Sequence, residues 1–373
     1  MSWRTSQVGG LVLVMVLLAN PASAAPAPTV GWGLNVLGQV GGTASGHPAP
    51  VAAAGGRQFT KIAVGQSHGL GIAADGTVWY WGDTDPRHYA FLQTFVTEPF
   101  QVPGLTNVIA VDGGEDTSVA LRSDGTVWAW GANEVGQLGD GTRTNRTTPV
   151  RVTGLTGVVA VSAGRTHGMA LKSDGTVWTW GNNRGGALGD GTQTDRLTPV
   201  RAGTLTGVTG ITAAAHFSLA IGADGRVSSW GENGHGQLGS GIVSPFRATP
   251  GPVAGLTGVA SVAAGQEFAL ALRANGEVWS WGMNSSGQLG DGTTTQRLLP
   301  VKVPGLGAVQ EIGVGSFCAA VRVGGSVYTW GSNSGNQLGD PGVTERATPG
   351  LVPGLSGVQQ LAVGGPFMVV RTG

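Results

Sequence analysis

Residues 157–181 read GVVAVSAGRTHGMALKSDGTVWTWG, and this stretch holds three extended segments of a repeated unit. The first two, GVVAVSAG and HGMALK, consist of apolar and small residues that suit strands buried on both faces. Asp174 and Gly175 then separate HGMALK from TVWTWG, and an Asp-Gly pair between two such segments is a strong hairpin signal. We expect a type I′ turn here, which requires positive φ at both central positions.

The same turn position recurs along the chain with residues that tolerate positive φ. A polar loop after each Trp-Gly pair leads to a fourth segment, which reads TPVRV from Thr148 and LPVKV from Leu299. Each unit therefore supplies four short strands in antiparallel order. The equivalent turn pairs are Asp75-Gly76, Asp124-Gly125, Asp224-Gly225, Asn275-Gly276 and Gly324-Gly325.

Trp-Gly pairs mark the repeat period, at intervals of 49, 49, 50, 50, 51 and 49 residues. A sheet of four short strands cannot bury both of its faces alone, so neighbouring units must stack against one another. A closed ring of such sheets is a β-propeller, and the sequence therefore predicts an all-β, seven-bladed propeller of four-stranded antiparallel blades. The tryptophans of these pairs are Trp32, Trp81, Trp130, Trp180, Trp230, Trp281 and Trp330.

The two ends of the chain indicate how this ring closes. The last copy stops at VRTG, residues 370–373, where every other copy makes its hairpin turn. Near the other end, residues 28–33 read PTVGWG and match TVWTWG without any preceding strands. We expect the N-terminal strand to complete the final blade, which would leave no sheet edge at the seam.

Residues 1–24 have the pattern of a secretory signal peptide, with Arg4 before an apolar run over residues 8–19 and small residues at 22–24. The run is too short to cross a bilayer, and no second candidate membrane span follows it. We expect cleavage near Ala24, export to the periplasm or the medium, and a single propeller domain over residues 25–373.

Composition limits the possible partners. Lys and Arg total 21, as do Asp and Glu, so the sequence predicts no basic surface for nucleic acid. The single Cys318 cannot form an intramolecular disulfide. The sequence shows no cluster of metal ligands and no cofactor motif in a supporting context, so we expect no metal, no cofactor and a monomeric protein.

The loop after each Trp-Gly pair carries the most specific motif of the chain. Followed by AGxxHxxAL and DGTVWxWG, it resembles the repeat of the regulator of chromosome condensation family, and the resemblance covers the whole chain after residue 24. It implies a seven-bladed propeller. Family members include nuclear exchange factors for a small GTPase and exported bacterial propellers, some of which inhibit β-lactamases; with a signal peptide, this chain is similar to the exported bacterial type. The copies read WGANEVGQLGDGT (130–142), WGNNRGGALGDGT (180–192), WGENGHGQLGSG (230–241), WGMNSSGQLGDGT (281–293) and WGSNSGNQLGD (330–340).

Residues that recur in most copies are interpreted as parts of the scaffold. A loop Asp is followed six residues later by an Arg, as in Asp190 and Arg196, and such a pair braces the loop through charge-assisted hydrogen bonds. Paired tryptophans such as Trp178 and Trp180 share a strand face, and we expect them to pack between blades with the indole N–H bonded to backbone. A ring of indoles that binds a sugar or a protein is the alternative.

One loop departs from the pattern entirely, and we expect function there. After Trp81 the motif is replaced by DTDPRHYAFLQTFVTEPF, which is rich in aromatic residues of the types enriched at interface centres. A second departure is IVSPFRATP at residues 242–250. The predicted partner-binding residues are Arg87, His88, Tyr89, Phe91, Phe95, Phe246 and Arg247. Two alternatives for the first loop are a local core of its own aromatics and a cation site of Asp83, Asp85 and His88.

These observations favour a protein-binding scaffold outside the cytosol, with inhibition of an exported enzyme as one form of that role. A propeller enzyme that acts on polysaccharide is the alternative, although the sequence shows no carboxylate pair and no nucleophile with its base. Export separates the chain from the cytosolic GTPases on which the nuclear family members act. We therefore expect a protein partner and no catalytic residues.

Overall fold

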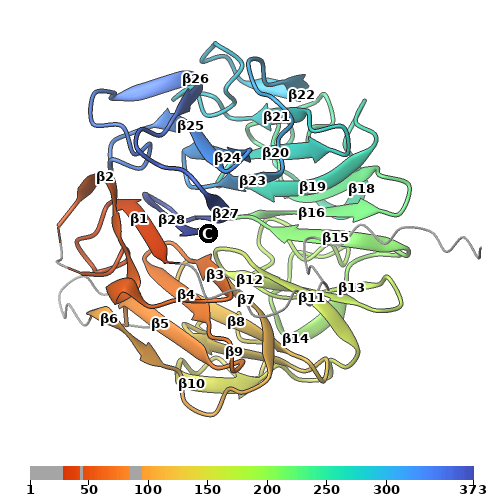
Figure 1. Ribbon diagram of the computed structural model, residues 1–373. Helices are drawn as coiled ribbons and strands as arrows, with labels where there is room; N and C mark the ends of the chain where they lie inside the picture. The colour runs from red at the N-terminus through yellow and green to blue at the C-terminus, as the bar shows by residue number, and fades with distance from the viewer. Residues whose placement is uncertain (1–27, 43–44, 85–94) are drawn as a thin grey trace, which may run out of the picture.

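The computed structural model describes residues 28–42, 45–84 and 95–373, and these form seven four-stranded antiparallel sheets. The sheets stand as blades around a common centre (Figure 1), which confirms the predicted all-β, seven-bladed propeller. The short 3-10 turn η1 (Ala54–Gly56) is the one helical element in the described part of the chain. None of the described helical structure is long or apolar enough to cross a membrane. The predicted signal peptide lies outside the described residues.

Six blades are built from consecutive strands, and we number them along the chain. Blade 1 contains β3 (Lys61–Val64), β4 (His68–Ile72), β5 (Val78–Asp83) and β6 (Phe95–Gln101). Blade 2 contains β7 (Val108–Gly113), β8 (Thr117–Arg122), β9 (Val127–Gly131) and β10 (Arg146–Arg151). Blade 3 contains β11 (Val158–Ala163), β12 (His167–Lys172), β13 (Val177–Gly181) and β14 (Arg196–Arg201).

The remaining blades repeat this order, and the last one joins the two ends of the described chain. Blade 4 contains β15 (Val208–Ala213), β16 (Phe217–Gly222), β17 (Val227–Glu232) and β18 (Phe246–Pro252). Blade 5 contains β19 (Val259–Ala264), β20 (Phe268–Arg273), β21 (Val278–Gly282) and β22 (Arg297–Lys302). Blade 6 contains β23 (Glu311–Val314), β24 (Cys318–Val323), β25 (Ser326–Ser332) and β26 (Glu345–Leu351). Blade 7 contains β27 (Val358–Val363), β28 (Phe367–Thr372), β1 (Thr29–Gly33) and β2 (His47–Ala52).

The seam in blade 7 has the predicted form. Strand β1 pairs antiparallel with β28, from Thr29 opposite Arg371 to Gly33 opposite Phe367, so the red and dark blue ends of the chain lie side by side (Figure 1). The side-chain amide of Gln360 then links blade 7 to blade 1, because it donates to the carbonyl of Ile62 and accepts from the amide of Ile62 at 2.8 and 3.1 Å. The ring is therefore closed by strand pairing and by hydrogen bonds between blades.

The hairpin turns differ from the prediction in most blades. At Asp124-Gly125 only the glycine has positive φ, and the amide of Gly125 donates to the carbonyl of Arg122. Such a turn is a type I turn closed by a left-handed glycine rather than the predicted type I′ turn. The Asp124 carboxylate caps it by accepting from the amide and hydroxyl of Thr126. The prediction holds at Gly324-Gly325, where both residues have positive φ and Val323 pairs directly with Ser326.

The hydrophobic core is divided into seven clusters, one at each contact between neighbouring blades. Each cluster contains the tryptophan of one Trp-Gly pair, for example Trp130 between blades 1 and 2 and Trp230 between blades 3 and 4. We call these contacts junction 1/2 and junction 3/4. The stability of the ring therefore depends on how well each tryptophan is enclosed at its junction.

One end of the propeller carries both the divergent segment and the repeated loops. Because consecutive strands are antiparallel, the connections between first and second strands and those between third and fourth strands emerge at the same end. We call this end the loop face. Residues 85–94 belong to a connection between a third and a fourth strand, so the segment around them begins and ends on the loop face of blade 1.

Candidate functional site

The structure places only part of the predicted binding surface. Arg87, His88, Tyr89 and Phe91 lie outside the described residues, as do Asp85 and His88 of the alternative cation site. Phe95 and Phe246 are both half-buried and occupy equivalent positions, opposite Asp83 in blade 1 and opposite Glu232 in blade 4. Blades 2 and 3 lie between them, so the structure does not bring these two aromatic residues together.

Arg247 does not break the repeat, contrary to the sequence analysis. It pairs opposite Gly231 as Arg196 pairs opposite Gly181, and it is therefore the repeat arginine of blade 4. The residue that differs is Ser240, which replaces the loop aspartate. Arg247 donates instead to the carbonyl and hydroxyl of Ser229 and to the carbonyl of Gly251, at 2.8, 2.9 and 2.9 Å. Burial lowers the pKa of its guanidinium, which is engaged inside blade 4.

The predicted Asp-Arg brace is present where the aspartate is retained. Arg196 Nε donates to Asp190 at 2.8 Å and Arg297 Nε donates to Asp291 at 2.7 Å. In blade 1 the position opposite Gly82 is Val96, so this blade has no arginine in the bracing position. The described residues of blade 1 therefore do not form this brace.

Each regular junction is completed by a hydrogen bond from tryptophan to a loop of the preceding blade. The indole N–H donates to a main-chain carbonyl at 2.8–3.0 Å, and these six indoles are fully buried. The bonds join Trp32 to Gln337, Trp81 to Gln39, Trp180 to Gln137, Trp230 to Ala187, Trp281 to Gln237 and Trp330 to Gln288. This confirms the predicted packing and backbone bond for Trp81, Trp180 and Trp281, the second tryptophans of three of the four pairs. Trp178 packs against the cluster between blades 2 and 3 as predicted, but its N–H donates to the Thr176 hydroxyl rather than to backbone.

Junction 1/2 departs from this arrangement. Trp130 is 6% exposed, and its indole N–H has no hydrogen-bond partner among the residues that the structure describes. A cavity of about 200 Å³ lies beside it, between blades 1 and 2. Blade 1 has Thr84 where regular blades have the asparagine that holds the loop, as Asn183 does by accepting from the amide of Leu188 at 3.0 Å. The loop that covers the tryptophan elsewhere is thus missing from the described part of this junction.

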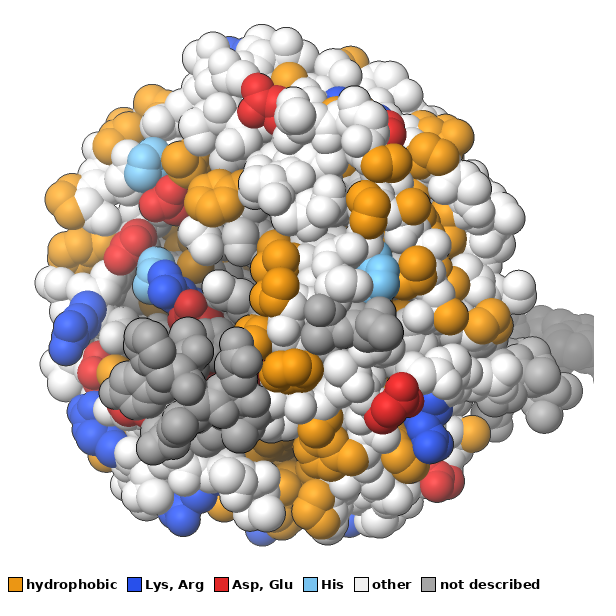
Figure 2. All heavy atoms as spheres, turned by 90° about the vertical axis from the view of Figure 1, so that its left-hand side faces the viewer, with side chains coloured by type: hydrophobic (Ala, Val, Ile, Leu, Met, Phe, Trp, Pro, Cys, Tyr) orange, Lys and Arg blue, Asp and Glu red, His pale blue; other side chains and the backbone are white. Residues whose placement is uncertain are grey.

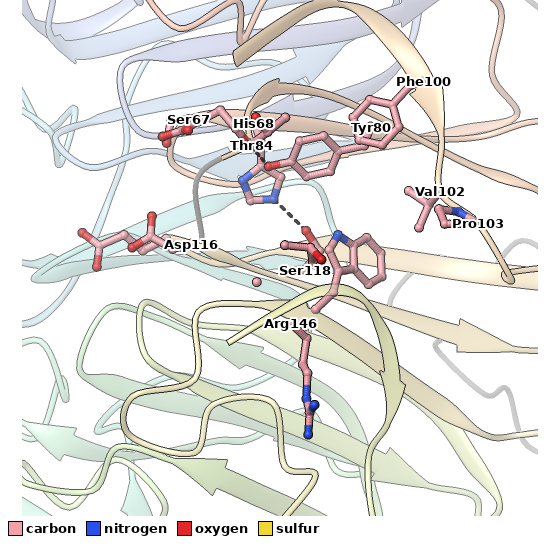
Figure 3. Close-up of a pocket in the computed structure, with 15 residues that line it drawn as sticks. Ser67, His68, Tyr80, Thr84, Phe100, Val102, Pro103, Asp116, Ser118 and Arg146 are labelled. Carbon is pink, nitrogen blue, oxygen red and sulfur yellow. Dashed lines mark hydrogen bonds between the residues drawn. The ribbon is translucent and has the colours of Figure 1, made fainter. Parts of the chain in front are cut away.

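A histidine and a serine face one another across junction 1/2. His68 Nε2 lies 3.0 Å from Ser118 Oγ, and the His68 ring stacks on Tyr80 with centroids 5.0 Å apart (Figure 3). Phe100 lies on the far side of Tyr80, with ring centroids 5.6 Å apart. The cavity wall therefore combines aromatic faces with a hydroxyl group that can donate.

Tyr80 is the clearest sign in the sequence that this junction differs, and the sequence analysis missed it. Other blades have a small residue at this position: Ala129, Thr179, Ser229, Ser280 and Thr329. In blade 3, Thr179 donates to the carbonyl of the loop residue Leu188 at 2.7 Å. Tyr80 donates instead to the carbonyl of Asp83. Burial, with Asp83 and Asp116 nearby, raises the pKa of Tyr80 well above its usual value, so its hydroxyl remains a donor.

The central channel has polar groups of its own, and they are bonded between blades. The channel encloses about 630 Å³ and is lined by the first strands of the blades. Asp112 accepts from the hydroxyl of Ser162 and the amide of Ala163 at 3.1 and 2.9 Å. Burial raises the pKa of its carboxyl to about 6. Lys61 crosses to the carbonyl of Ile109 at 2.6 Å, so these channel groups serve to join neighbouring blades.

The surface chemistry of the described residues shows no concentrated charge site. No group of three or more His, Cys, Asp or Glu side chains that could hold a metal ion occurs within the described ranges. On the face that Figure 2 shows, Lys and Arg side chains lie among Asp and Glu side chains and form no continuous basic patch in its coloured part. The features that distinguish this propeller are therefore the divergent sequence after Trp81 and the cavity at junction 1/2.

Two kinds of family model match the chain. A model described as the RCC1-like domain matches residues 27–257. Models of the regulator of chromosome condensation (RCC1) repeat match residues 259–288, 275–321 and 324–370. Together these matches extend over almost the whole of the propeller.

Solved structures with the same architecture support the fold. The chain is similar to Prp20p from Saccharomyces cerevisiae, with a TM-score of 0.83 and 23% identity, over 93% of this chain and 92% of that one. A second structure of yeast RCC1 (Prp20), bound to Kap60, matches with a TM-score of 0.83 and 21% identity, over 100% of this chain and 96% of that one. Human WBSCR16 matches with a TM-score of 0.83 and 24% identity, over 93% and 99% of the two chains.

Proposed function

Since this chain belongs to the RCC1-like propeller family, we propose that it acts as a protein-binding scaffold whose partner docks on the loop face of blade 1. The yeast relative Prp20p was described with binding properties to Gsp1p and histones, and in a second structure it is bound to Kap60. Binding of proteins is thus a property of similar propellers. Which protein is bound has to follow from the surface of each propeller, because the fold alone does not determine it.

The observation that carries this proposal is the loss of the repeat loop in one blade. Six junctions use the loop to cover a buried tryptophan, whereas blade 1 replaces it with a segment rich in aromatic residues. The described residues of blade 1 supply no carbonyl to the indole of Trp130, as the repeat loop does for Trp230. Aromatic residues together with arginine are the types that supply most of the binding energy at protein interfaces.

We further propose that the protein is exported and that its partner is an exported protein, such as an enzyme that it inhibits. The support is the sequence of residues 1–24, where a basic residue, an apolar run and small residues follow in the order of a signal peptide. A partner in the periplasm or the medium is then the only kind that the propeller meets. The polysaccharide enzyme suggested as an alternative gains no support from Asp112, the channel carboxylate with a raised pKa, because its carboxylate is bonded to Ser162 and Ala163 of the next blade.

The test is capture of a partner from the exported fraction of the source cells, with the tagged full-length chain expressed there as bait. The chain should be recovered with a mature N-terminus near Ala25 and with one stoichiometric protein. Replacing Tyr89 and Phe91 together with alanine should abolish capture without changing the melting temperature. The matched control replaces Leu299 and Leu351, which are 48% and 49% exposed on other blades, and should retain capture.

Three results would contradict the proposal. Full capture by the Tyr89→Ala, Phe91→Ala variant would remove the loop from the binding surface. An intact N-terminus in a cytosolic protein would remove export, and a small GTPase recovered from the cytosol would then favour the exchange role of nuclear relatives. Turnover of glycans by the purified chain alone would favour the enzyme.

A further inference from the structure

Junction 3/4 shows what the cavity at junction 1/2 is built to hold. There, the carbonyl of Ala187 accepts two hydrogen bonds from blade 4, one from Trp230 Nε1 at 2.8 Å and one from Ser218 Oγ at 2.9 Å. Because the Ser218 hydroxyl gives its proton to this carbonyl, the 2.9 Å contact with His167 Nε2 places the proton of that bond on the histidine. The result is a two-donor site for one main-chain carbonyl.

Junction 1/2 has the same donors in the same places. Trp130 and Ser118 are the counterparts of Trp230 and Ser218, since they pair with each other across β8 and β9 as the latter do across β16 and β17. His68 lies 3.0 Å from Ser118 as His167 lies 2.9 Å from Ser218. The carbonyl is the missing member, because the Trp130 N–H has no acceptor among the described residues although the side chain is 94% buried. Trp130 lines the cavity, and its N–H is not among the fully buried donors that lack a partner, so a ligand carbonyl can reach it from the cavity.

We propose that the cavity at junction 1/2 binds a turn of a partner protein that presents a main-chain carbonyl followed by an aliphatic residue and a glycine. The chain itself supplies this ligand at the regular junctions, as Gln-Val-Gly at residues 39–41, Ala-Leu-Gly at 187–189, and Gln-Leu-Gly at 137–139, 237–239, 288–290 and 337–339. In each of these the glycine has φ between +61° and +91°. The partner would thus supply the carbonyl that the described residues of junction 1/2 do not provide.

The glycine in this ligand has a steric reason. A methyl group on Gly189 would come within 2.7 Å of Trp230 Nε1, so only glycine lets the chain pass this close to the indole edge. The same close approach is found between Gly290 and Trp330 and between Gly339 and Trp32, at 2.6 and 2.8 Å. A partner turn with alanine at that position should therefore not fit beside Trp130.

The size and lining of the cavity suit one aliphatic side chain. Its volume is about 200 Å³, whereas an engineered apolar cavity of about 150 Å³ is large enough for benzene. Tyr80, Phe100 and Val102 supply apolar wall, and Ser67, Asp83 and Asp116 bring polar groups from the loop face. The cavity therefore lies where the partner proposed above would dock, and this inference deepens that proposed function.

The experiment uses the full-length protein, labelled with ¹⁵N, and the acetylated and amidated peptide Gly-Gly-Ala-Leu-Gly-Asp, which copies residues 185–190. The indole N–H signal of Trp130, assigned from a Trp130→Phe variant, should shift to saturation as the peptide is added. Peptide affinity, measured by calorimetry, should fall about three- to tenfold in Trp130→Phe and in Ser118→Ala, because each loses one hydrogen bond. The same peptide with alanine in place of its second-last glycine should not bind.

Trp230→Phe is the matched control, because its junction already contains the carbonyl of Ala187. That variant should bind the peptide with wild-type affinity. The inference is overturned if the Trp130 signal does not move at saturating peptide, or if affinity is unchanged in both Trp130→Phe and Ser118→Ala. Such a result would leave the proposed function standing if Tyr89 and Phe91 are still needed for capture. If the Tyr89→Ala, Phe91→Ala variant still captured the partner while the peptide bound at Trp130, the cavity inference would stand and the role of the loop would not.

Discussion

Junctions 1/2 and 3/4 share a histidine, a serine and a tryptophan, yet among the described residues only junction 3/4 contains the carbonyl that these residues surround. At junction 3/4, Ala187 accepts from Trp230 and Ser218, and Trp230 is fully buried. At junction 1/2, the equivalent tryptophan borders a cavity of about 200 Å³. The donors are present at both junctions, whereas the loop sequence differs and Tyr80 and Val96 stand where blade 3 has Thr179 and Arg196. In the binding that we propose, a repeat protein gains a binding site by losing one internal ligand.

The two junctions should differ most in the stability that is lost when their tryptophans are replaced. Trp230→Phe removes a buried hydrogen bond and leaves space in a closed junction, so it should lower the free energy of unfolding by about 1–3 kcal/mol. Trp130→Phe removes a donor that has no acceptor, next to a cavity that already exists, and should cost less than about 1 kcal/mol. Chemical denaturation of both variants, with unchanged dependence on denaturant, measures the difference. Equal losses would mean that the two junctions are equally closed.

His167 gives a second effect, which is absent at neutral pH and grows as the pH falls. Burial, with a further contribution from His216, lowers the pKa of His167 to about 3, while an unfolded histidine titrates near 6.5. Between these values the unfolded chain binds the proton first, so the stability that neutral His167 contributes is complete above about pH 6.5 and is lost as the pH falls toward 3. The side-chain amide in His167→Gln can still donate to Ser218 but does not titrate, so this pH dependence of the stability should disappear.

The measurement is the free energy of unfolding of His167→Gln relative to the parent chain at several pH values. The difference should be nearly constant above pH 7 and should move in favour of the variant as the pH falls, by up to about 1.4 kcal/mol per pH unit. His235→Gln removes a side chain that is 40% exposed and serves as the control. A pH-independent difference for His167→Gln would show that junction 3/4 admits the charged ring.

Much of the fold follows from the sequence because its physical causes are local and repeated. The spacing of the Trp-Gly pairs, from Trp32 to Trp330, predicts the number of blades, and the match of residues 28–33 to the third strand predicts the seam. The turn type could not be read from Asp-Gly alone, because a carboxylate that caps the turn, as Asp124 does, favours negative φ at its own residue. Gly324 has no side chain and adopts the type I′ turn.

The site was only partly predictable, and the reason lies in contacts between blades. Aligning the repeats with one another finds the divergent segment. The same alignment led us to predict Arg247 as a binding residue, because we overlooked that Ser240 replaces the loop aspartate of the other copies. It also passed over Tyr80 and Trp130. The sequence around Trp130 matches the repeat. At a regular junction the indole bonds to a loop carbonyl some 40 residues earlier in the chain, as Trp180 bonds to Gln137. Among the described residues, Trp130 has no such carbonyl. Such a loss appears only when neighbouring blades are placed side by side.

Solvent exchange of the indole N–H groups tests the central claim most directly. Two-dimensional NMR of the ¹⁵N-labelled protein, with signals assigned from Trp130→Phe and Trp230→Phe, reports the exchange of each indole proton with water. We predict that the Trp230 proton is strongly protected by its bond to Ala187, whereas the Trp130 proton exchanges much faster and becomes protected when the peptide is added. Protection of Trp130 equal to that of Trp230 in the free protein would show that junction 1/2 is already filled and would contradict the account.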